Sequence, residues 1–123
     1  MGRHKSPRPT DAELSILTVL WRRGPSTVRE VHEDLSREKV TGYTTVLKFL
    51  QIMTEKELVV RDESRRSHVY TPKHSEEYTQ QLLVRDLVQR AFNGSAAGLI
   101  KQTLLAGTPS NEELAEIRRL LNS

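Results

Sequence analysis

A short run of hydroxyl, amide and ammonium side chains near the middle of the 123-residue chain has chemistry suited to contacts with a nucleic acid. At 100° per residue, Thr44, Lys48 and Gln51 fall on one side of a helix, with Thr45 at the edge of that side. Short hydrogen-bond donors and a cation on a face without core residues suit the major groove. Tyr43 precedes them, and its hydroxyl could reach a phosphate. The same composition is common on solvated surfaces, so this face alone does not decide the function.

Two further groups of polar residues would support such a contact. Thr27 and Arg29 open the preceding helix, whose N-terminus would face the phosphate backbone in a helix-turn-helix. Arg65 and Arg66 lie at the tip of a predicted hairpin and suit a minor groove or phosphates, and His68 follows on the adjoining strand. A charged turn that protects a sheet edge is the alternative interpretation of the two arginines.

The basic residues are concentrated in the first part of the chain. Residues 1–73 hold 14 Lys and Arg against 10 Asp and Glu, whereas residues 74–123 hold 5 against 6. A polyanion would therefore bind the first part. We predict a flexible basic arm at residues 1–9, a DNA-binding domain at residues 10–73 and a helical region at residues 74–123.

Capping motifs define where the first two helices of the DNA-binding domain begin. Thr10-x-x-Glu13 and Thr27-x-x-Glu30 are capping boxes, in which each side chain satisfies a backbone N–H group of the other residue. Gly24-Pro25 ends the first helix. The sequence therefore predicts two short helices, each followed by a turn.

A third helix and a hairpin complete the predicted domain. The helix runs from about residue 42 to residue 56, with Val46, Leu50 and Met53 on one apolar face. Residues 40–42 have room for one short strand before it. The period then changes to two at residues 58–61 and 68–71, which predicts paired strands around a polar loop. Three helices and a hairpin in this order indicate a winged helix-turn-helix. The predicted fold class is mainly α with a small β-hairpin, followed by a C-terminal helical dimerisation region.

Three apolar stripes indicate three helices after residue 73, the last one beginning at the capping box Ser110-x-x-Glu113. Such wide stripes cannot bury themselves well within 50 residues, so we expect them to pair with a second copy of the chain. A helical cap packed on the same chain's winged helix, which would leave a monomer, is the alternative. The predicted dimerisation residues are Tyr78, Leu82, Leu83, Leu87, Val88, Phe92, Leu99, Ile100, Leu104, Leu114, Ile117 and Leu121.

Several functional classes find no support in the sequence. The chain has no cysteine, which excludes disulfides and thiolate metal sites. Its histidines, His4, His32, His68 and His74, form no metal-binding pair on one helix, so we predict no metal and no cofactor. No nucleophile–base pattern or glycine-rich phosphate loop indicates an enzyme. No apolar run is long enough for membrane insertion and no signal segment is visible, which leads us to expect a cytoplasmic protein.

Several short motifs follow one another in a fixed order between residues 10 and 72. They are Leu20-Trp21, Gly24-Pro25-Ser26-Thr27-Val28-Arg29-Glu30-Val31, Tyr43-Thr44-Thr45-Val46, Lys56-x-Leu58-Val59 and Arg66 with Tyr70-Thr71-Pro72. This series resembles the penicillinase-repressor (BlaI/MecI) family. The resemblance implies dimeric repressors that bind palindromic DNA operators through the N-terminal winged helix and pair through the C-terminal helices. It also implies, for many members, a membrane-bound sensor protease whose pathway leads to a cut in the C-terminal region.

The chain departs from this family pattern at three points. Without cysteine it cannot use the cysteine-based copper switch of one branch. Glu57 replaces the usual glycine after the third helix, so we expect either a different cap geometry or a slightly longer helix. Gln102-Thr103 replaces the Asn-Phe pair of cleaved relatives, which argues against regulation by cutting there.

The function predicted from the sequence is that of a sequence-specific DNA-binding repressor acting as a homodimer on double-stranded operator DNA. The alternative is a winged-helix protein–protein interaction module without DNA binding. The two differ in salt dependence, because DNA binding through several Lys and Arg side chains weakens steeply as salt rises.

Overall fold

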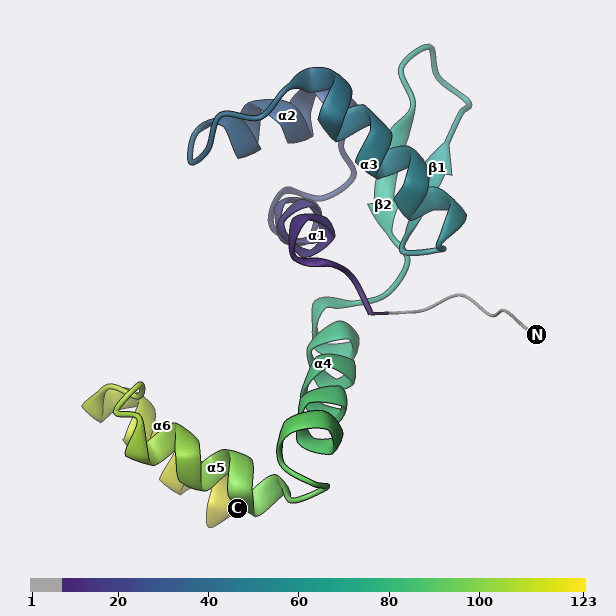
Figure 1. The fold of residues 1–123 in the computed structure, drawn as a ribbon. Helices are drawn as coiled ribbons and strands as arrows, with labels where there is room; N and C mark the ends of the chain where they lie inside the picture. The colour runs from purple at the N-terminus through teal and green to yellow at the C-terminus, as the bar shows by residue number, and fades with distance from the viewer. Residues whose placement is uncertain (1–7) are drawn as a thin grey trace, which may run out of the picture. The chain divides into compact units, whose positions relative to one another are not determined.

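The structure of the protein is a computed structural model that describes residues 8–123, so most of the predicted basic arm lies outside the described residues. Within this range the chain forms six helices and one two-stranded antiparallel sheet (Figure 1). The predicted fold class, mainly α with a small β-hairpin, is confirmed. The elements are α1 (Asp11–Arg23), α2 (Val28–Ser36), α3 (Tyr43–Glu55), β1 (Val59–Asp62), β2 (Val69–Pro72), α4 (Glu76–Ala91), α5 (Ala96–Leu105) and α6 (Asn111–Leu121).

The capping boxes begin α1 and α2 as the sequence predicted. The hydroxyl of Thr10 accepts from the backbone N–H of Glu13 at 3.2 Å, and the Glu13 carboxylate accepts from the Thr10 N–H at 2.9 Å. Thr27 and Glu30 repeat the same exchange at the start of α2. Gly24 ends α1 with a φ of 91°, a conformation that L side chains rarely adopt. These local signals mark where the first two helices begin and where α1 ends.

The end of α3 keeps the cap geometry of a glycine although Glu57 occupies the position. The N–H of Glu57 donates to the carbonyl of Thr54 at 3.1 Å, and the N–H of Leu58 donates to the carbonyl of Met53 at 2.9 Å. This pair of bonds is a Schellman motif, and it places Glu57 at a φ of 63°. Our expectation of a different cap or a longer helix was therefore wrong. Burial of Leu58 against the core holds the chain in this turn.

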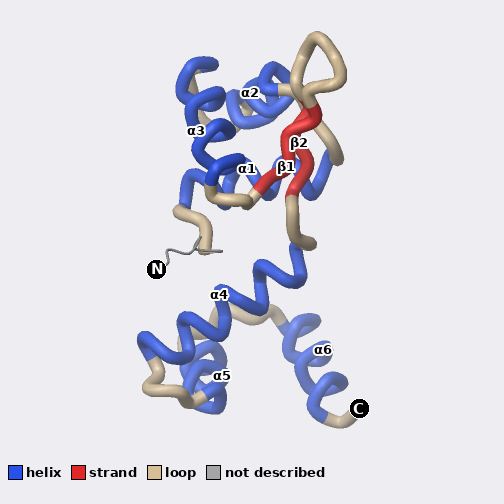
Figure 2. Tube along the Cα trace, turned by 90° about the vertical axis from the view of Figure 1, so that its right-hand side faces the viewer, coloured by secondary structure: helices blue, strands red, loops and turns tan. Residues whose placement is uncertain are grey.

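Both strands of the hairpin, β1 and β2, begin and end one residue later than the sequence predicted. Val60 faces Thr71 and Arg61 faces Tyr70 in the antiparallel register. A third segment joins the sheet at Ser26, whose backbone exchanges hydrogen bonds of 2.8 and 3.1 Å with Tyr70. The short strand expected at residues 40–42 does not form, because that segment has no neighbouring strand edge. The loop between the strands extends beyond them at the end of the sheet nearest α2 (Figures 1 and 2).

The hydrophobic core lies between α1, α2, α3 and the hairpin. One face of α3 supplies Val46, Leu50 and Met53, all fully buried, as the helical period predicted. The partly buried side chains of Trp21, Leu35, Leu47 and Phe49 pack against this core. The buried hydrophobic residues are Ile16, Leu17, Val19, Leu20, Val28, Val31, Val46, Leu50, Met53, Leu58, Val59 and Tyr70.

The chain divides into two compact units between Leu83 and Val84, within α4. The first turns of α4 belong to the winged-helix unit, because Trp21 Nε1 donates to the carbonyl of His74 at 3.0 Å and Thr79 is buried. The domain boundary drawn at residue 73 stays a prediction.

All regular elements of the second unit, residues 84–123, are helices. Asn93 and Gly94, both with positive φ, separate α4 from α5, and a capping box on Ser110 begins α6. None of its residues is fully buried. Across residues 8–123, no helix is long and apolar enough to cross a membrane.

Candidate nucleic-acid interface

The helix α3 divides into a buried side and an exposed polar side. Val46, Leu50 and Met53 face the core, while the opposite side points to solvent. That side is free to enter a groove, and we call it the recognition face. It consists of Tyr43, Thr44, Thr45, Lys48 and Gln51, all exposed.

The N-terminus of α3 has no side-chain cap. Side chains of Thr10, Thr27, Ser95 and Ser110 cap the N-termini of α1, α2, α5 and α6, whereas Gly42 begins α3 without such a bond. The first turn of α3 also contains no acidic residue. Free N–H groups at a helix start attract anions, and the helix dipole adds to this attraction. The recognition face therefore begins at a point that suits a phosphate.

The start of α2 offers one free cation and one hydroxyl that already has a structural role. Thr27 Oγ1 accepts the capping bond from Glu30, so it can meet a phosphate only as a donor, through its remaining proton. Arg29 is exposed one residue into α2 and has no ion pair with the described residues. Because α2 packs against α3, both N-termini belong to one structural unit. The predicted phosphate contacts at Thr27 and Arg29 stay predictions.

The loop of the hairpin presents its basic residues to solvent. Arg65, Arg66 and His68 are exposed, and neither arginine has an ion pair within residues 8–123. A turn at the base of the loop is held by Asp62, whose carboxylate accepts from the backbone N–H of Ser64 at 2.9 Å. This hydrogen bond lowers the pKa of Asp62 below its ordinary value. Both arginines are exposed, and their contact with a polyanion stays a prediction.

Two buried charges support this surface, and sequence reasoning missed the role of both. The Glu13 side chain, whose residue is only 2% exposed, accepts from Lys56 Nζ at 2.7 and 3.0 Å. The capping box placed Glu13 at the start of α1, but its pairing with the end of α3 links residues 43 positions apart. No local pattern reveals such a contact. The pair ties the C-terminal end of the recognition helix to α1.

Asp34 is the second buried charge, and three arginines surround it. Its carboxylate lies 3.2 Å from Arg23, 3.3 Å from Arg37 and 3.6 Å from Arg22. Arg22 and Arg23 belong to the last turn of α1, so the cluster fixes the C-terminal half of α2 against α1. Opposite charges next to a buried carboxylate compensate the cost of its burial. The cluster therefore has a structural role within the helix-turn-helix.

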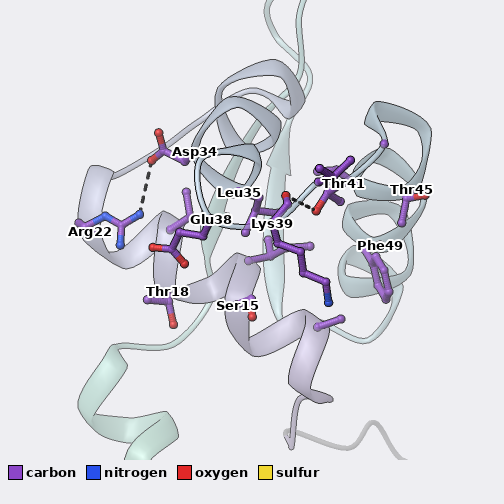
Figure 3. A pocket seen from close by; sticks show the side chains of 16 residues that line it. Ser15, Thr18, Arg22, Asp34, Leu35, Glu38, Lys39, Thr41, Thr45 and Phe49 are labelled. Atoms are coloured by element: carbon purple, nitrogen blue, oxygen red, sulfur yellow. Dashed lines mark hydrogen bonds and ion pairs between the residues drawn. The ribbon is translucent and has the colours of Figure 1, made fainter.

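A cavity of about 620 Å³ lies beside the start of the recognition helix. It is bounded by α1, the second half of α2, the segment 38–42 and the first turns of α3 (Figure 3). Thr45 belongs both to the cavity wall and to the recognition face. Figure 3 also shows Thr41 bonded to the carbonyl of Lys39, at 3.1 Å, in the wall of the cavity. No pattern in the sequence predicted this cavity.

Comparison with known proteins places the chain in a family. The family model described as "Penicillinase repressor" matches residues 9–123. The chain belongs to the penicillinase repressor family. This is a family of transcriptional repressors rather than enzymes, so the resemblance found in the sequence is confirmed, as is the prediction that the chain is not an enzyme.

Curated relatives support the same assignment. The transcriptional regulator BlaI of Mycobacterium tuberculosis is 40% identical over 93 residues, which cover 74% of this chain and 67% of that protein. The penicillinase repressor of Bacillus licheniformis is 26% identical over 117 residues, which cover 95% of this chain and 91% of that protein. The second match spans both compact units.

Solved structures resemble the first unit. The DNA-binding domain of the repressor BlaI superposes with a TM-score of 0.53 at 28% identity, covering 60% of this chain and 90% of that chain. Monomeric Bacillus licheniformis BlaI in complex with the blaP half-operator superposes with a TM-score of 0.51, also at 28% identity, over 58% of this chain and 87% of that chain. The winged-helix unit is therefore similar to a domain that has been observed on DNA.

Proposed function

We propose that this penicillinase repressor family member binds a palindromic operator as a homodimer, with the recognition face of α3 in the major groove. The observation that carries the proposal is the division of α3 into a core face and an exposed polar face with an uncapped N-terminus. The likeness of the winged-helix unit to monomeric BlaI in complex with the blaP half-operator supports DNA binding by this unit. Thr44, Thr45, Lys48 and Gln51 would contact base edges.

Phosphate contacts would fix the register of that helix on DNA. Tyr43, Thr27 and Arg29 lie at the starts of α2 and α3, where free N–H groups strengthen a phosphate contact. Arg65 and Arg66 on the exposed loop would contact the minor groove or the adjacent backbone, with His68 beside them. Basic residues at the start of α2 and on the hairpin loop would hold the DNA backbone. The exposed side of α3 would provide the sequence specificity.

The apolar surface of residues 84–123 supports the pairing of two chains. Ile100 and Leu104 of α5 and Leu121 of α6 are large hydrophobic side chains that remain at least 44% exposed. Exposed apolar patches of this kind mark protein interfaces. A two-fold pair would join two winged helices, and the second half-site contact would then be effectively intramolecular. Sedimentation of the full chain as a monomer at micromolar concentration would contradict this part of the proposal.

A membrane sensor pathway is the further partner that the family resemblance implies. In this chain Gln102 and Thr103 lie inside α5, and the Thr103 hydroxyl donates to the carbonyl of Leu99 at 2.8 Å. Proteases favour exposed loop tips over helical backbone. We therefore expect the sensor to act without a cut at this pair. Intact chain in mass spectra of induced cells is the expected result, and a fragment ending at Gln102 would contradict it. The proposal places the protein in the cytoplasm, with the DNA.

Lys48→Ala tests the recognition face directly. We expect operator binding to weaken by about 1–3 kcal/mol, with relaxed preference at one base position, if Lys48 contacts a base. Lys101→Ala is the matched control, because this substitution removes the same charge from an exposed site of α5, outside the winged-helix unit. Fluorescence anisotropy at fixed salt measures both variants. Equal affinity of wild type and Lys48→Ala would remove Lys48 from the interface.

Salt titration separates DNA binding from the alternative, a protein–protein interaction module. Operator binding through several basic residues should weaken steeply and log-linearly as salt rises. A partner protein bound mainly through apolar contacts would show little salt dependence.

A further inference from the structure

One histidine side chain bonds the turn between α2 and α3. His32 Nε2 donates to the backbone carbonyl of Thr41 at 2.7 Å, across nine residues of sequence. Because a carbonyl oxygen can only accept, the proton lies on Nε2 in this contact. The bond joins the middle of α2 to the residue immediately before the N-cap of the recognition helix.

Few other contacts hold this turn in place. Gly42 provides no side-chain cap for α3, and Val40 is 97% exposed and so contributes nothing to the core. The Thr41 hydroxyl donates to the carbonyl of Lys39 at 3.1 Å (Figure 3), and the N–H of Lys39 donates to the carbonyl of Leu35 at 3.1 Å, near the end of α2. The bond from His32 reaches the turn further along, immediately before Gly42, and adds a second attachment to α2.

The same imidazole also contacts the first residue of α3. The rings of His32 and Tyr43 lie edge to face, with centroids 5.8 Å apart and planes inclined by 74°. This is a favourable arrangement for two aromatic rings. Tyr43 is 48% exposed, so the contact restrains its ring while leaving the other side free for DNA. His32 thus holds the backbone before Gly42 and the side chain after it.

We propose that His32 is a positioning residue for operator recognition, which sets the first turn of α3 through the Thr41 carbonyl and the Tyr43 ring. The inference rests on the proposed function, since it concerns how the recognition face is aimed. Thr44 and Thr45 follow directly in the chain, so a shift of this turn displaces the residues proposed to contact bases. Phosphate attraction is long-ranged and sequence-independent, so it tolerates such a shift better than base contacts do.

The test compares operator DNA with unrelated DNA of equal length, using the full chain. His32→Ala removes both contacts, His32→Gln keeps an N–H donor, and His32→Phe keeps a ring. We expect the ratio of operator affinity to unrelated-DNA affinity to fall about 3- to 10-fold in His32→Ala, the effect of one net hydrogen bond. His32→Gln should recover most of the ratio. Ser36→Ala, at an exposed site of the same helix, should leave it unchanged.

A merely structural role predicts a different pattern. Partial unfolding lowers both affinities by the same factor and leaves their ratio intact, so an unchanged ratio in a folded His32→Ala protein overturns the inference. If circular dichroism shows that His32→Ala is unfolded, the other two variants decide. A higher ratio in His32→Gln than in His32→Phe supports the hydrogen bond to Thr41, and equal or reversed ratios overturn it. Absence of any operator preference in the wild type would instead overturn the proposed function.

Discussion

The two compact units of this chain use hydrophobic residues in opposite ways. The winged-helix unit places twelve of them in a core that α1, α2, α3 and the hairpin close completely. Residues 84–123 form equally regular helices, yet no side chain in them is fully buried. Regular helices alone do not make a stable unit, because most helical stability in proteins comes from packing an apolar face. The first unit has that packing within one chain, whereas the second leaves its apolar side chains partly exposed.

A smaller contrast exists within the first unit. The helices α1 and α2 begin with complete capping boxes, whereas α3 begins at a glycine without a cap. The helix proposed to contact DNA is thus the one whose free N–H groups are left for another partner. At its other end, Glu57 adopts the left-handed backbone conformation, which is unfavourable for a residue with a side chain. The recognition helix is held by tertiary contacts more than by its own termini.

Leu50→Ala should have the largest effect on the stability of the first unit. Leu50 is fully buried in α3, and loss of a buried leucine costs about 2–5 kcal/mol. Urea unfolding followed by fluorescence of Trp21, the only tryptophan, measures the winged-helix unit. Ile52→Ala, at a 40% exposed site of the same helix, should cost less than about 1 kcal/mol. Equal losses in the two variants would remove the distinction between core and surface in α3.

Leu104→Asp should disrupt the proposed dimer and leave the winged-helix unit folded. A charge on this 44% exposed leucine opposes burial in a dimer interface, so we expect a monomer and an operator affinity about 100-fold weaker. Gln102→Asp adds the same charge at an exposed site of the same helix and serves as the control. Sedimentation gives the oligomeric state and anisotropy the affinity. A Leu104→Asp protein that remains dimeric would contradict the assigned surface.

Glu57→Gly should stabilise the first unit modestly. Glycine adopts the left-handed conformation freely, so relief of Glu57 should contribute about 1 kcal/mol. The exposed ion pair of Glu57 with Lys73, at 3.0 Å, is lost and offsets a few tenths of a kcal/mol of this gain. Glu57→Ala loses the ion pair without gaining glycine's freedom, and it should show no gain. Urea midpoints of the three proteins test the sign.

Gly42→Asp should have the smallest effect on stability, a slight increase, and it should weaken operator binding. A Cβ at Gly42 would lie 3.6 Å from Thr45 Oγ1, an ordinary contact, so a capping side chain fits. A new cap should stabilise α3 by a few tenths of a kcal/mol, about the usual difference between aspartate and glycine there. Operator binding should nevertheless weaken about 10-fold or more, because a like charge then faces the phosphates.

Gly42→Ser supplies a neutral cap in the same place and separates the two effects. It should stabilise α3 similarly while weakening operator binding much less than Gly42→Asp. Equal operator affinities of the aspartate and serine variants would show that the start of α3 does not face DNA.

Much of this fold was predictable because its signals are local. Capping boxes at Thr10, Thr27 and Ser110 depend on residues three positions apart, and the helical period identified Val46, Leu50 and Met53 as core. Long-range contacts were not predictable in the same way. The pairing of Ser26 with Tyr70 and of Glu13 with Lys56 joins segments more than 40 residues apart.

The candidate site shows the same division. The exposed side of α3 followed from the helical period, because it is what remains when the core face is assigned. The bond from His32 to Thr41 had no sequence signal, since a lone histidine on a helix is most often a surface residue. Which side chains contact bases depends on the docking of α3 in DNA, and helix geometry alone does not determine this docking.

Selection of bound fragments from the organism's own DNA would show whether two paired winged helices recognise a palindrome. We expect the full chain to enrich fragments with a shared palindrome, whose half-sites lie one helical turn, about 34 Å, or a multiple apart. This result requires both a helix α3 that discriminates bases and a two-fold pair that places two such helices together. Fragments without a common sequence, or with one asymmetric half-site only, would contradict operator recognition by a homodimer.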